Sequence, residues 1–479
     1  MKESDVGKGD NVDKRGESVD STSDKLLADS GPKQEPSKLA PFEINPSIKP
    51  ADALPFELGP AASKECPVNP VYGKFIDEIF LRSFDTRNLG DREAVRSKDA
   101  CSIKTDEDAV RKANEFLEST PDPYDKVFSK QEMEAFRQAA GGNSRNIGVI
   151  LQTNLDAEER EEIRAPFLVE EVQPGSSAET YGLKVGDKIT RINGRDATEF
   201  SNYNAMKAFG SEGGDKVQLS IERDGVPMEL EIPKQLRDKK PVSGRMEGNI
   251  AYIKINTFLH DNVAEDLKAV LERYKDAQGY VIDLRDNGGG YFSTALQAAS
   301  LFVDKGVLVR SHNKLRSEPG NPQFADKEYG LDDQGMYEKV TDPNGTSVDR
   351  SLKRFPDLVD KPVIILTNGR SASASEIFAA ALRDNGAATI KGTRSFGKGE
   401  IQTIDMAFPN GTALKVTTGE YTTPAGRFLG DGAKKRYGII PDQIIKNSSG
   451  ALRGSQYDSQ LRQALTSMEI NNFFGPPNR

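Results

Sequence analysis

The hydrophobic pattern changes its period along the chain and divides it into segments of different kinds. Residues 1–64 show no periodic apolar pattern and are rich in Ser, Asp, Lys, Glu, Pro and Gly. Such a segment buries too little apolar surface to offset the entropy of ordering it, so it is predicted to be disordered. Within residues 65–145 apolar positions recur at helical spacing, which predicts a helical domain. Thr105 and Ser129 have the residue pattern of helix starts.

Residues 146–234 instead show the short strand-like runs and turn signals of a β-domain. Two such runs, Ile147–Leu151 and Phe167–Val172, precede the sequence P-G-S-S-A-E-T-Y-G-L-K-V-G-D-K-I-T-R-I-N-G. That sequence resembles a PDZ domain along its whole length. The resemblance implies that the C-terminal end of a peptide adds a strand beside the first strand of the domain. The peptide-binding strand is expected at Gly148, Val149, Ile150 and Leu151, although a β-domain that binds nothing has the same pattern.

Strand-like and helix-like segments alternate within residues 235–446, which predicts an α/β core. Gly279–Leu284 and Lys361–Thr367 are continuous apolar runs of the kind found in buried strands. The polar, glycine-rich stretch between His312 and Arg350 is interpreted as an excursion over the surface. Residues 447–479 are expected to form a C-terminal helical segment and tail.

Composition and charge exclude several classes of protein. A formal net charge of −9, with 65 basic and 74 acidic residues, argues against general nucleic-acid binding. No segment approaches the roughly 18 apolar residues that a membrane helix needs. Met1–Lys25 lacks the apolar segment of a signal peptide, so the chain is expected either to be processed or truncated, or to stay inside the cell. Cys66 and Cys101 have no metal-ligand spacing, and their number alone leaves open whether they pair.

Histidine usage limits the chemistry further. Only His260 and His312 are available to a Ser-His-Asp hydrolase or to a histidine-ligated metal site. His260 follows a strand-like run, His312 is expected in a charged loop, and neither has a supporting motif nearby. Both are interpreted as ordinary surface or loop residues. A hydrolase with this sequence therefore needs another base.

The stretch N-G-R-S-A-S-A-S-E-I-F-A contains the first candidate catalytic residue, Ser373. This serine lies between a buried strand and a very apolar helix, and with Glu376 it has the spacing of a capping box. Backbone amides and the helix dipole stabilise negative charge at a helix N-terminus, which suits the tetrahedral oxyanion of acyl transfer. Taken alone, however, S-A-S-A-S is also typical of tight packing or capping.

Lys398 is the second candidate, between two glycines in F-G-K-G-E-I-Q. A lysine acts as a general base only when its pKa falls from about 10.4 to about 7–8, and burial supplies such a shift. The shift costs about 3–5 kcal/mol, so a folded core must enforce it. Taken alone, G-K-G is usual in exposed loops.

A third motif, D-L-R-D-N-G-G-G, ends the first of the two buried strands. Its glycine amides are able to form a nest for an oxyanion, although such a turn is also an ordinary strand-ending loop. A phosphate-binding loop is not expected, because the Lys-Ser/Thr pair that such a loop requires is missing.

Together, the motifs resemble those of the carboxy-terminal processing peptidases, also called tail-specific proteases, over roughly residues 70–470. The matching sequences, in chain order after the PDZ segment, are I-A-Y-I-K-I-N-T-F, V-I-D-L-R-D-N-G-G-G, S-A-S-A-S-E-I-F-A, F-G-K-G-E-I-Q, L-K-V-T-T-G-E-Y-T-T-P-A-G-R and G-I-I-P-D. In this family the nucleophilic serine stands 25 residues before the lysine base, which is the separation of Ser373 and Lys398. The resemblance therefore implies that these two residues form the catalytic dyad.

The resemblance also implies roles for three further residues. Gln402 matches a glutamine that orients the lysine, and the backbone amides of Ala374 and Gly289 are expected to form the oxyanion hole. Gly288 departs from the proline or serine that the family often has there, but the glycines after it are intact. No metal or organic cofactor is implied.

The implied architecture is a crotonase-like (ββα-spiral) α/β peptidase core with a PDZ domain and an N-terminal helical region. The implied activity is endoproteolysis near the C-termini of protein or peptide substrates, outside the cytoplasm in a bacterial periplasm or envelope or in the thylakoid lumen. A homo-oligomer, a regulatory adaptor and the direction of any PDZ effect stay open. The alternative is a non-catalytic PDZ-containing binding or scaffold protein, which has no need of Ser373, Lys398 and Gln402 together.

Overall fold

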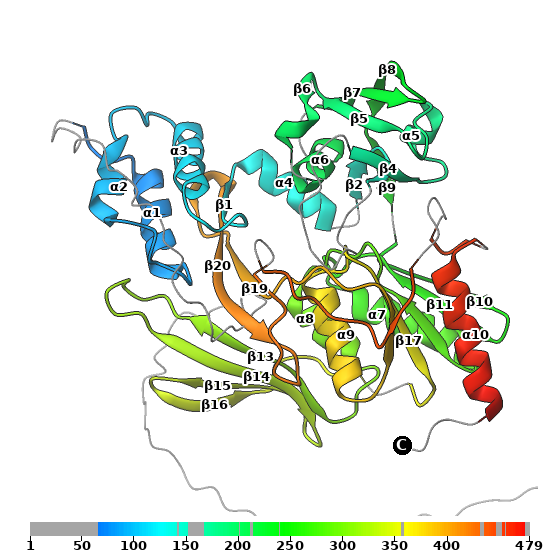
Figure 1. The fold of residues 1–479 in the computed structure, drawn as a ribbon. Coiled ribbons are helices and arrows are strands. Elements are labelled where there is room, and N and C mark those ends of the chain that lie inside the picture. The colour runs from blue at the N-terminus through cyan, green and yellow to red at the C-terminus, as the bar shows by residue number, and fades with distance from the viewer. Residues whose placement is uncertain are drawn as a thin grey trace, which may run out of the picture. The chain divides into compact units, whose positions relative to one another are not determined.

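The computed structural model describes residues 66–140, 143–151, 167–200, 202–210, 214–238, 240–355, 359–431, 435–446, 453–455 and 457–474. All of them lie in one of the two units into which the chain divides, Leu39–Arg479. The segment predicted to be disordered, residues 1–64, lies outside the described residues. Helices and strands both contribute, in agreement with the predicted α/β class (Figure 1).

The first part of the described chain is helical, as its apolar period predicts. Its elements are α1 (Pro70–Arg82), α2 (Arg92–Lys98), α3 (Asp106–Glu118), β1 (Lys126–Phe128) and α4 (Lys130–Ala140). Thr105 begins α3 with the expected reciprocal bonds, because its hydroxyl accepts the N–H of Asp108 and its own N–H donates to the Asp108 carboxylate. A disulfide joins Cys66 to Cys101, with their Cα atoms 5.2 Å apart.

The segment that resembles a PDZ domain is mostly β-structure. Its elements are β2 (Asn143–Asn146), β3 (Val149–Leu151), β4 (Phe167–Val172), α5 (Ser177–Thr180), β5 (Lys188–Ile192), β6 (Arg195–Asp196), the 3-10 turn η2 (Ala197–Glu199), α6 (Asn202–Phe209), β7 (Lys216–Arg223), β8 (Val226–Pro233) and β9 (Gln235–Asp238). One sheet has the strand order β3–β4–β5–β7–β8, with β6 paired to β5, and β2 pairs separately with β9. Alternate residues of β4 and β7 are buried, which is why the sequence alternates there.

A six-stranded, mostly parallel sheet forms the α/β core. The elements of this layer are β10 (Val242–Glu247), β11 (Ile250–Ile255), α7 (Val263–Arg273), β12 (Tyr280–Asp283), α8 (Phe292–Ala299), β17 (Val363–Thr367), α9 (Ala374–Asp384), β18 (Thr389–Gly392) and β21 (Gln443–Ile444). The strand order is β10–β11–β12–β17–β18–β21, and only β10 is antiparallel to its neighbour. Every residue of β12 and β17 is buried, as the two apolar runs predict.

A second, antiparallel sheet corrects one interpretation of the sequence. It consists of β1 together with β13 (Gly306–Lys314), β14 (Phe324–Asp332), β15 (Gly335–Asp342), β16 (Gly345–Asp349), β19 (Glu400–Asp405) and β20 (Ala413–Thr422), with the 3-10 turn η3 (Pro409–Gly411) before β20. The stretch between His312 and Arg350 is thus strand rather than a surface excursion, and His312 lies in β13 rather than in a loop. Polar side chains pair across these strands, as Lys327 does with Glu338, so apolar alternation is weak there.

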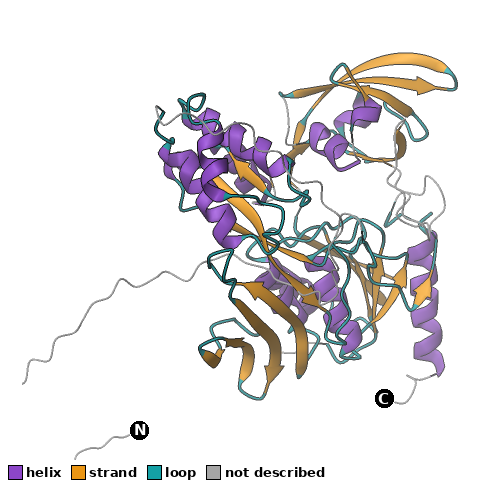
Figure 2. Cartoon of the chain, turned by 60° about the vertical axis from the view of Figure 1, so that its left-hand side comes forward, coloured by secondary structure: helices purple, strands orange, loops and turns teal. Residues whose placement is uncertain are grey.

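Helices α8 and α9 are buried in the largest apolar cluster, where Phe378 packs against Phe258 and Phe302 with ring centroids 5.7 and 5.8 Å apart. The C-terminal helix α10 (Ser459–Phe474) covers a separate cluster that includes Val281 and Leu366 of the parallel sheet. In both views α10 runs alongside this sheet (Figures 1 and 2). Apolar side chains therefore cover β12 and β17, the two strands that lead into the glycine turn and the Ser373 segment.

Candidate active site

The junction between β17 and α9 presents Ser373. Strand β17 ends at Thr367 and α9 begins at Ala374, so the serine occupies the position immediately before the helix. It adopts a φ of +55°, a left-handed conformation that residues other than glycine rarely take. Such strain persists only when the surrounding structure enforces it, and it is common at functional sites. The half-buried Ser373 side chain is thus held at the N-terminus of a buried helix.

The glycine turn after β12 lies against this junction. A Cβ added at Gly289, whose φ is +98°, would come within 2.6 Å of the Ala372 carbonyl oxygen and 2.9 Å of the Ala374 nitrogen. The structure therefore brings together the two residues expected to form the oxyanion hole, Gly289 and Ala374. The Gly289 N–H donates to Asn287 Oδ1 at 3.0 Å. A substrate oxygen has to replace this side-chain oxygen in order to use the Gly289 amide.

A buried ionic group supports the glycine turn. Arg285 is 0% exposed and donates to both carboxylate oxygens of Asp283, at 2.9 and 2.7 Å, and of Asp458, at 2.9 and 2.6 Å. Burial raises the pKa of Asp283, but the charges of Arg285 and Lys254 outweigh it and the net pKa is lowered. Asp458 precedes α10, so this helix and the glycine turn share one ion-pair network.

The loop between β18 and β19 presents Lys398. Gly397 has a φ of +85°, and a Cβ there would lie 2.7 Å from the Gly438 nitrogen, so the loop requires glycine. The Lys398 ammonium donates to Gln402 Oε1, and Gln402 Nε2 donates to Thr417 Oγ1 at 3.3 Å. Gln402 thus lies where the resemblance places it, beside the lysine amine.

Tyr124 is a neighbour of the lysine that the sequence did not reveal. It lies in the loop between α3 and β1, and the centroid of its ring is 4.4 Å from Lys398 Nζ. The negative face of an aromatic ring stabilises an ammonium group at this distance. The next residue, Asp125, accepts the N–H of Thr417 at 2.7 Å, and burial raises the pKa of Asp125 well above its usual value. This loop therefore contacts both the lysine and the strand that supports Gln402.

One carboxylate connects the serine and lysine segments. Oε2 of Glu376 accepts the backbone N–H of Ser373 at 2.9 Å and that of Lys398 at 3.0 Å. Oε1 accepts the N–H of Gly397 at 2.7 Å and the hydroxyl of Ser395 at 2.5 Å. The sequence predicted the pairing of Glu376 with Ser373 but not its bonds to the lysine loop. The backbone N–H groups of the two predicted dyad residues thus donate to the same carboxylate oxygen.

Two buried carboxyl groups lie opposite each other on the strands after the lysine. Glu400 of β19 and Glu420 of β20 are register partners and are 9% and 2% exposed. Burial raises the pKa of Glu420 to about 8, with further contributions from the charges of Asp431 and Asp85. Burial also raises the pKa of Glu400 well above its usual value, against the opposing charge of Lys398. Glu420 therefore favours the protonated form at neutral pH, and the pKa of Glu400 is shifted in the same direction.

The predicted peptide-binding strand of the PDZ-like segment is β3. It forms one edge of its sheet and pairs with β4, while Gly148 before it has a φ of +80°. Val149, Ile150 and Leu151 are buried. Arg370, three residues before Ser373, donates to the Leu151 carbonyl at 3.2 Å. The strand expected to hold a peptide is thus in contact with the loop that presents the serine.

The two histidines have their own partners. His312 Nδ1 is 2.7 Å from Asp326 Oδ1, and its ring stacks on Phe324 at 4.8 Å. His260 Nδ1 accepts the N–H of Asn262 at 3.3 Å. Within the described part of the chain, no group of three or more His, Cys, Asp or Glu side chains is arranged to hold a metal ion. No described helix is both long and apolar enough to cross a membrane.

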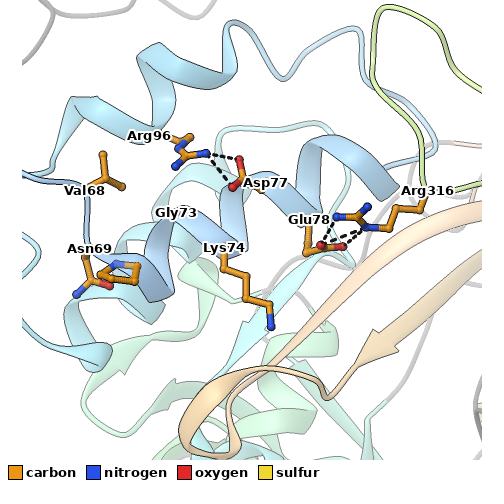
Figure 3. Close-up of a pocket in the computed structure, with 9 residues that line it drawn as sticks. Val68, Asn69, Gly73, Lys74, Asp77, Glu78, Arg96 and Arg316 are labelled. Carbon is orange, nitrogen blue, oxygen red and sulfur yellow. Dashed lines mark hydrogen bonds and ion pairs between the residues drawn. The ribbon is translucent and has the colours of Figure 1, made fainter. Parts of the chain in front are cut away.

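A cavity of about 240 Å³ lies beside α1, apart from these residues. Arg96 pairs with Asp77 at 2.7 Å and Arg316 pairs with Glu78 at 2.8 Å at its wall (Figure 3). The two arginines that line the cavity are thus already paired with carboxylates. None of the predicted catalytic residues lines it.

Comparison with known proteins agrees with these motifs. Residues 249–445 match the model of peptidase family S41, and residues 140–222 match that of the PDZ domain. A probable CtpA-like serine protease of Staphylococcus aureus (strain N315) is 30% identical over 345 residues, which cover 71% of this chain and 61% of the relative. A carboxyl-terminal-processing protease of Picosynechococcus sp. is 27% identical over 372 residues, which cover 76% of this chain and 80% of the relative.

A solved structure shares the fold. The photosystem II D1 C-terminal processing protease is similar with a TM-score of 0.53 and 22% identity, over 78% of this chain and 92% of that protein. The chain spans 61% of the length of the Staphylococcus aureus relative. Residues 140–222 and 249–445 are thus similar to a PDZ domain and to peptidase family S41, which confirms the α/β fold class and the resemblance to the carboxy-terminal processing peptidases.

Proposed function

We propose that this protein is a serine endopeptidase that cleaves protein substrates near their C-termini through a Ser373–Lys398 dyad. The observation that carries the proposal is the shared Glu376 oxygen, which holds the backbones of both residues at 2.9 and 3.0 Å. The contact of the Lys398 amine with Gln402 supports it further. Relatives named as serine and carboxyl-terminal-processing proteases agree with this activity.

In the proposed reaction, Ser373 Oγ attacks the carbonyl carbon of the scissile peptide while its proton passes to the neutral amine of Lys398. The carbonyl oxygen becomes an oxyanion, which the N–H groups of Ala374 and Gly289 stabilise. Collapse of the intermediate breaks the C–N bond, and the Lys398 ammonium returns its proton to the leaving amine. Water, deprotonated by Lys398, then hydrolyses the acyl ester on Ser373 and restores both groups.

The PDZ domain is proposed to hold the substrate tail at Gly148 and at β3, the strand that forms one edge of the sheet. An extracytoplasmic compartment, such as a periplasm or a thylakoid lumen, fits the Cys66–Cys101 disulfide, because disulfides persist in oxidising environments. Unstructured protein tails with apolar ends are the expected substrates.

The test compares wild type with Ser373→Ala and Lys398→Ala on an unstructured protein that has an apolar C-terminal tail. Fragment masses over time should show cleavage near the tail by wild type and none by the two variants. Exposed residues of the antiparallel sheet supply matched controls, Ser347→Ala and Lys339→Ala, which should retain wild-type turnover. Cleavage by Ser373→Ala at the wild-type rate would refute the dyad, and binding of the tail without cleavage by any form would favour the scaffold alternative.

A further inference from the structure

Glu376 is a buried carboxylate whose hydrogen-bonding capacity is fully used. It is 0% exposed and accepts four hydrogen bonds, two at each oxygen, from Ser373, Ser395, Gly397 and Lys398. Two bonds at each carboxylate oxygen occupy all four of the lone-pair positions that an ionised carboxylate offers. This group therefore serves two distant segments of the chain at once.

The direction of three of these bonds is fixed by the donor. Ser373, Gly397 and Lys398 contribute backbone N–H groups, which cannot accept a proton. The Ser395 hydroxyl accepts the N–H of Ile439 at 2.6 Å and lies 2.5 Å from Glu376 Oε1. A hydroxyl has a second acceptor lone pair, so Ser395 is the one donor of the four that is able to accept a proton from Glu376. The three backbone N–H groups therefore donate to Glu376 whichever way the Ser395 hydroxyl points.

The pKa of Glu376 reflects two opposing influences. Burial raises the pKa of this carboxyl, and the bonds from Ser395, Lys398, Gly397 and Ser373 oppose that effect only in part, so the net pKa is raised. Charge-assisted hydrogen bonds are the strong ones in a buried setting, and four converge here. The carboxyl group and its four donors thus form one polar group inside an otherwise apolar helix start.

The backbone conformations at both ends of this group need outside support. Ser373 has a φ of +55° and Gly397 a φ of +85°, and each donates its own N–H to Glu376. The carboxylate therefore stabilises the strained nucleophile turn and the glycine loop of the base in one arrangement. Near-attack geometry depends on such positions to within a fraction of an ångström.

From these contacts we infer that Glu376 is a positioning residue that sets the separation of Ser373 and Lys398. The inference rests on the proposed peptidase function of that dyad. Glu376 touches no reacting atom, and it acts only through the backbones of the two residues. Its loss should slow the chemical step and leave substrate binding as it is.

The test measures kcat and KM for wild type, Glu376→Gln and Ser395→Ala on the tail-bearing substrate, each corrected for the folded fraction. In Glu376→Gln an amide NH₂ replaces one oxygen and faces two donors, so kcat should fall at least 100-fold while KM changes less than threefold. Ser395→Ala keeps both bonds to the dyad residues and should lower kcat less than tenfold. Glu78→Gln removes a buried, ion-paired glutamate in α1 and controls for general destabilisation, with kcat expected within threefold of wild type.

The outcomes separate this inference from the proposed function. If wild type cleaves the substrate and Glu376→Gln has the same kcat, the positioning role is overturned, whereas the proposed dyad is not affected. If wild type does not cleave, or Ser373→Ala cleaves as well, the proposed function itself fails. If Glu376→Gln does not fold, Glu376→Asp, which keeps the charge but is one methylene shorter, takes its place. An unchanged kcat in that variant would equally overturn the inference.

Discussion

Replacing Glu420 by glutamine is expected to flatten the pH dependence of the protein's stability. Glu420 is 2% exposed and faces Glu400, and burial raises its pKa from 4.5 to about 8, with smaller contributions from Asp431 and Asp85. Between these two pH values the folded state binds a proton that the unfolded state has released. The stabilisation is therefore fully present below pH 4.5 and is lost as the pH rises through about 8.

The size of the effect follows from the two pKa values. A difference of about 3.5 between the folded and unfolded states corresponds to about 5 kcal/mol of unfolding free energy, at 1.36 kcal/mol for each pKa unit. Glutamine keeps the shape of the side chain but does not titrate. The variant should therefore gain stability relative to wild type as the pH increases, by up to about 5 kcal/mol above pH 8.

The assay is urea unfolding of wild type and Glu420→Gln between pH 5 and pH 9, with hydrogen exchange of β19 and β20 as a local measure of opening. Glu229→Gln, at an exposed position of β8, controls for the loss of one negative charge. The free-energy difference between Glu420→Gln and wild type should rise steadily with pH, and the Glu229→Gln difference should stay constant. Parallel curves for all three proteins would refute the assignment of a buried, protonated Glu420.

Two further changes probe the surroundings of the catalytic motifs. Tyr124→Leu removes the ring that stabilises the Lys398 ammonium, a contact that contributes about 0.5–2 kcal/mol, so the pH–rate profile should move by up to about 1.5 units toward lower pH; an unchanged profile would contradict this role. Asp458→Asn leaves buried Arg285 with one carboxylate partner. It should lower the free energy of unfolding, measured with urea, by about 3 kcal/mol. A loss under about 1 kcal/mol would show that the ion-pair network tolerates the change.

The parts of the fold that the sequence predicts are those set by local periodicity. The apolar runs Gly279–Leu284 and Lys361–Thr367 became β12 and β17 because strands buried on both faces must be apolar throughout. Ser129 begins α4 with the predicted reciprocal bonds to Glu132. This prediction succeeds because a capping box is complete within four residues. These helices and strands can therefore be predicted from local sequence alone, before the segments that pack against them are known.

The antiparallel sheet escaped prediction because its stability comes from pairing between strands. His312 pairs with Asp326, Lys327 with Glu338 and Thr341 with Thr346, and none of these contacts is visible as alternation within one strand. A polar strand looks like a loop when its sequence is considered alone. Only the register, which joins residues on different strands, distinguishes the two.

The candidate site shows the same limit, with one informative exception. Tyr124 and Thr417 reach the lysine and Gln402 from segments that no spacing connects to them. Glu376, however, is the single charged residue between Ala374 and Leu382, in a helix start that is otherwise apolar or small. A carboxylate in such a position must be saturated by donors, and its cap on Ser373 uses only part of its capacity. The remaining oxygen lone pairs require donors from another segment, and a glycine loop, such as the one around Lys398, is the kind of segment whose backbone amides supply them.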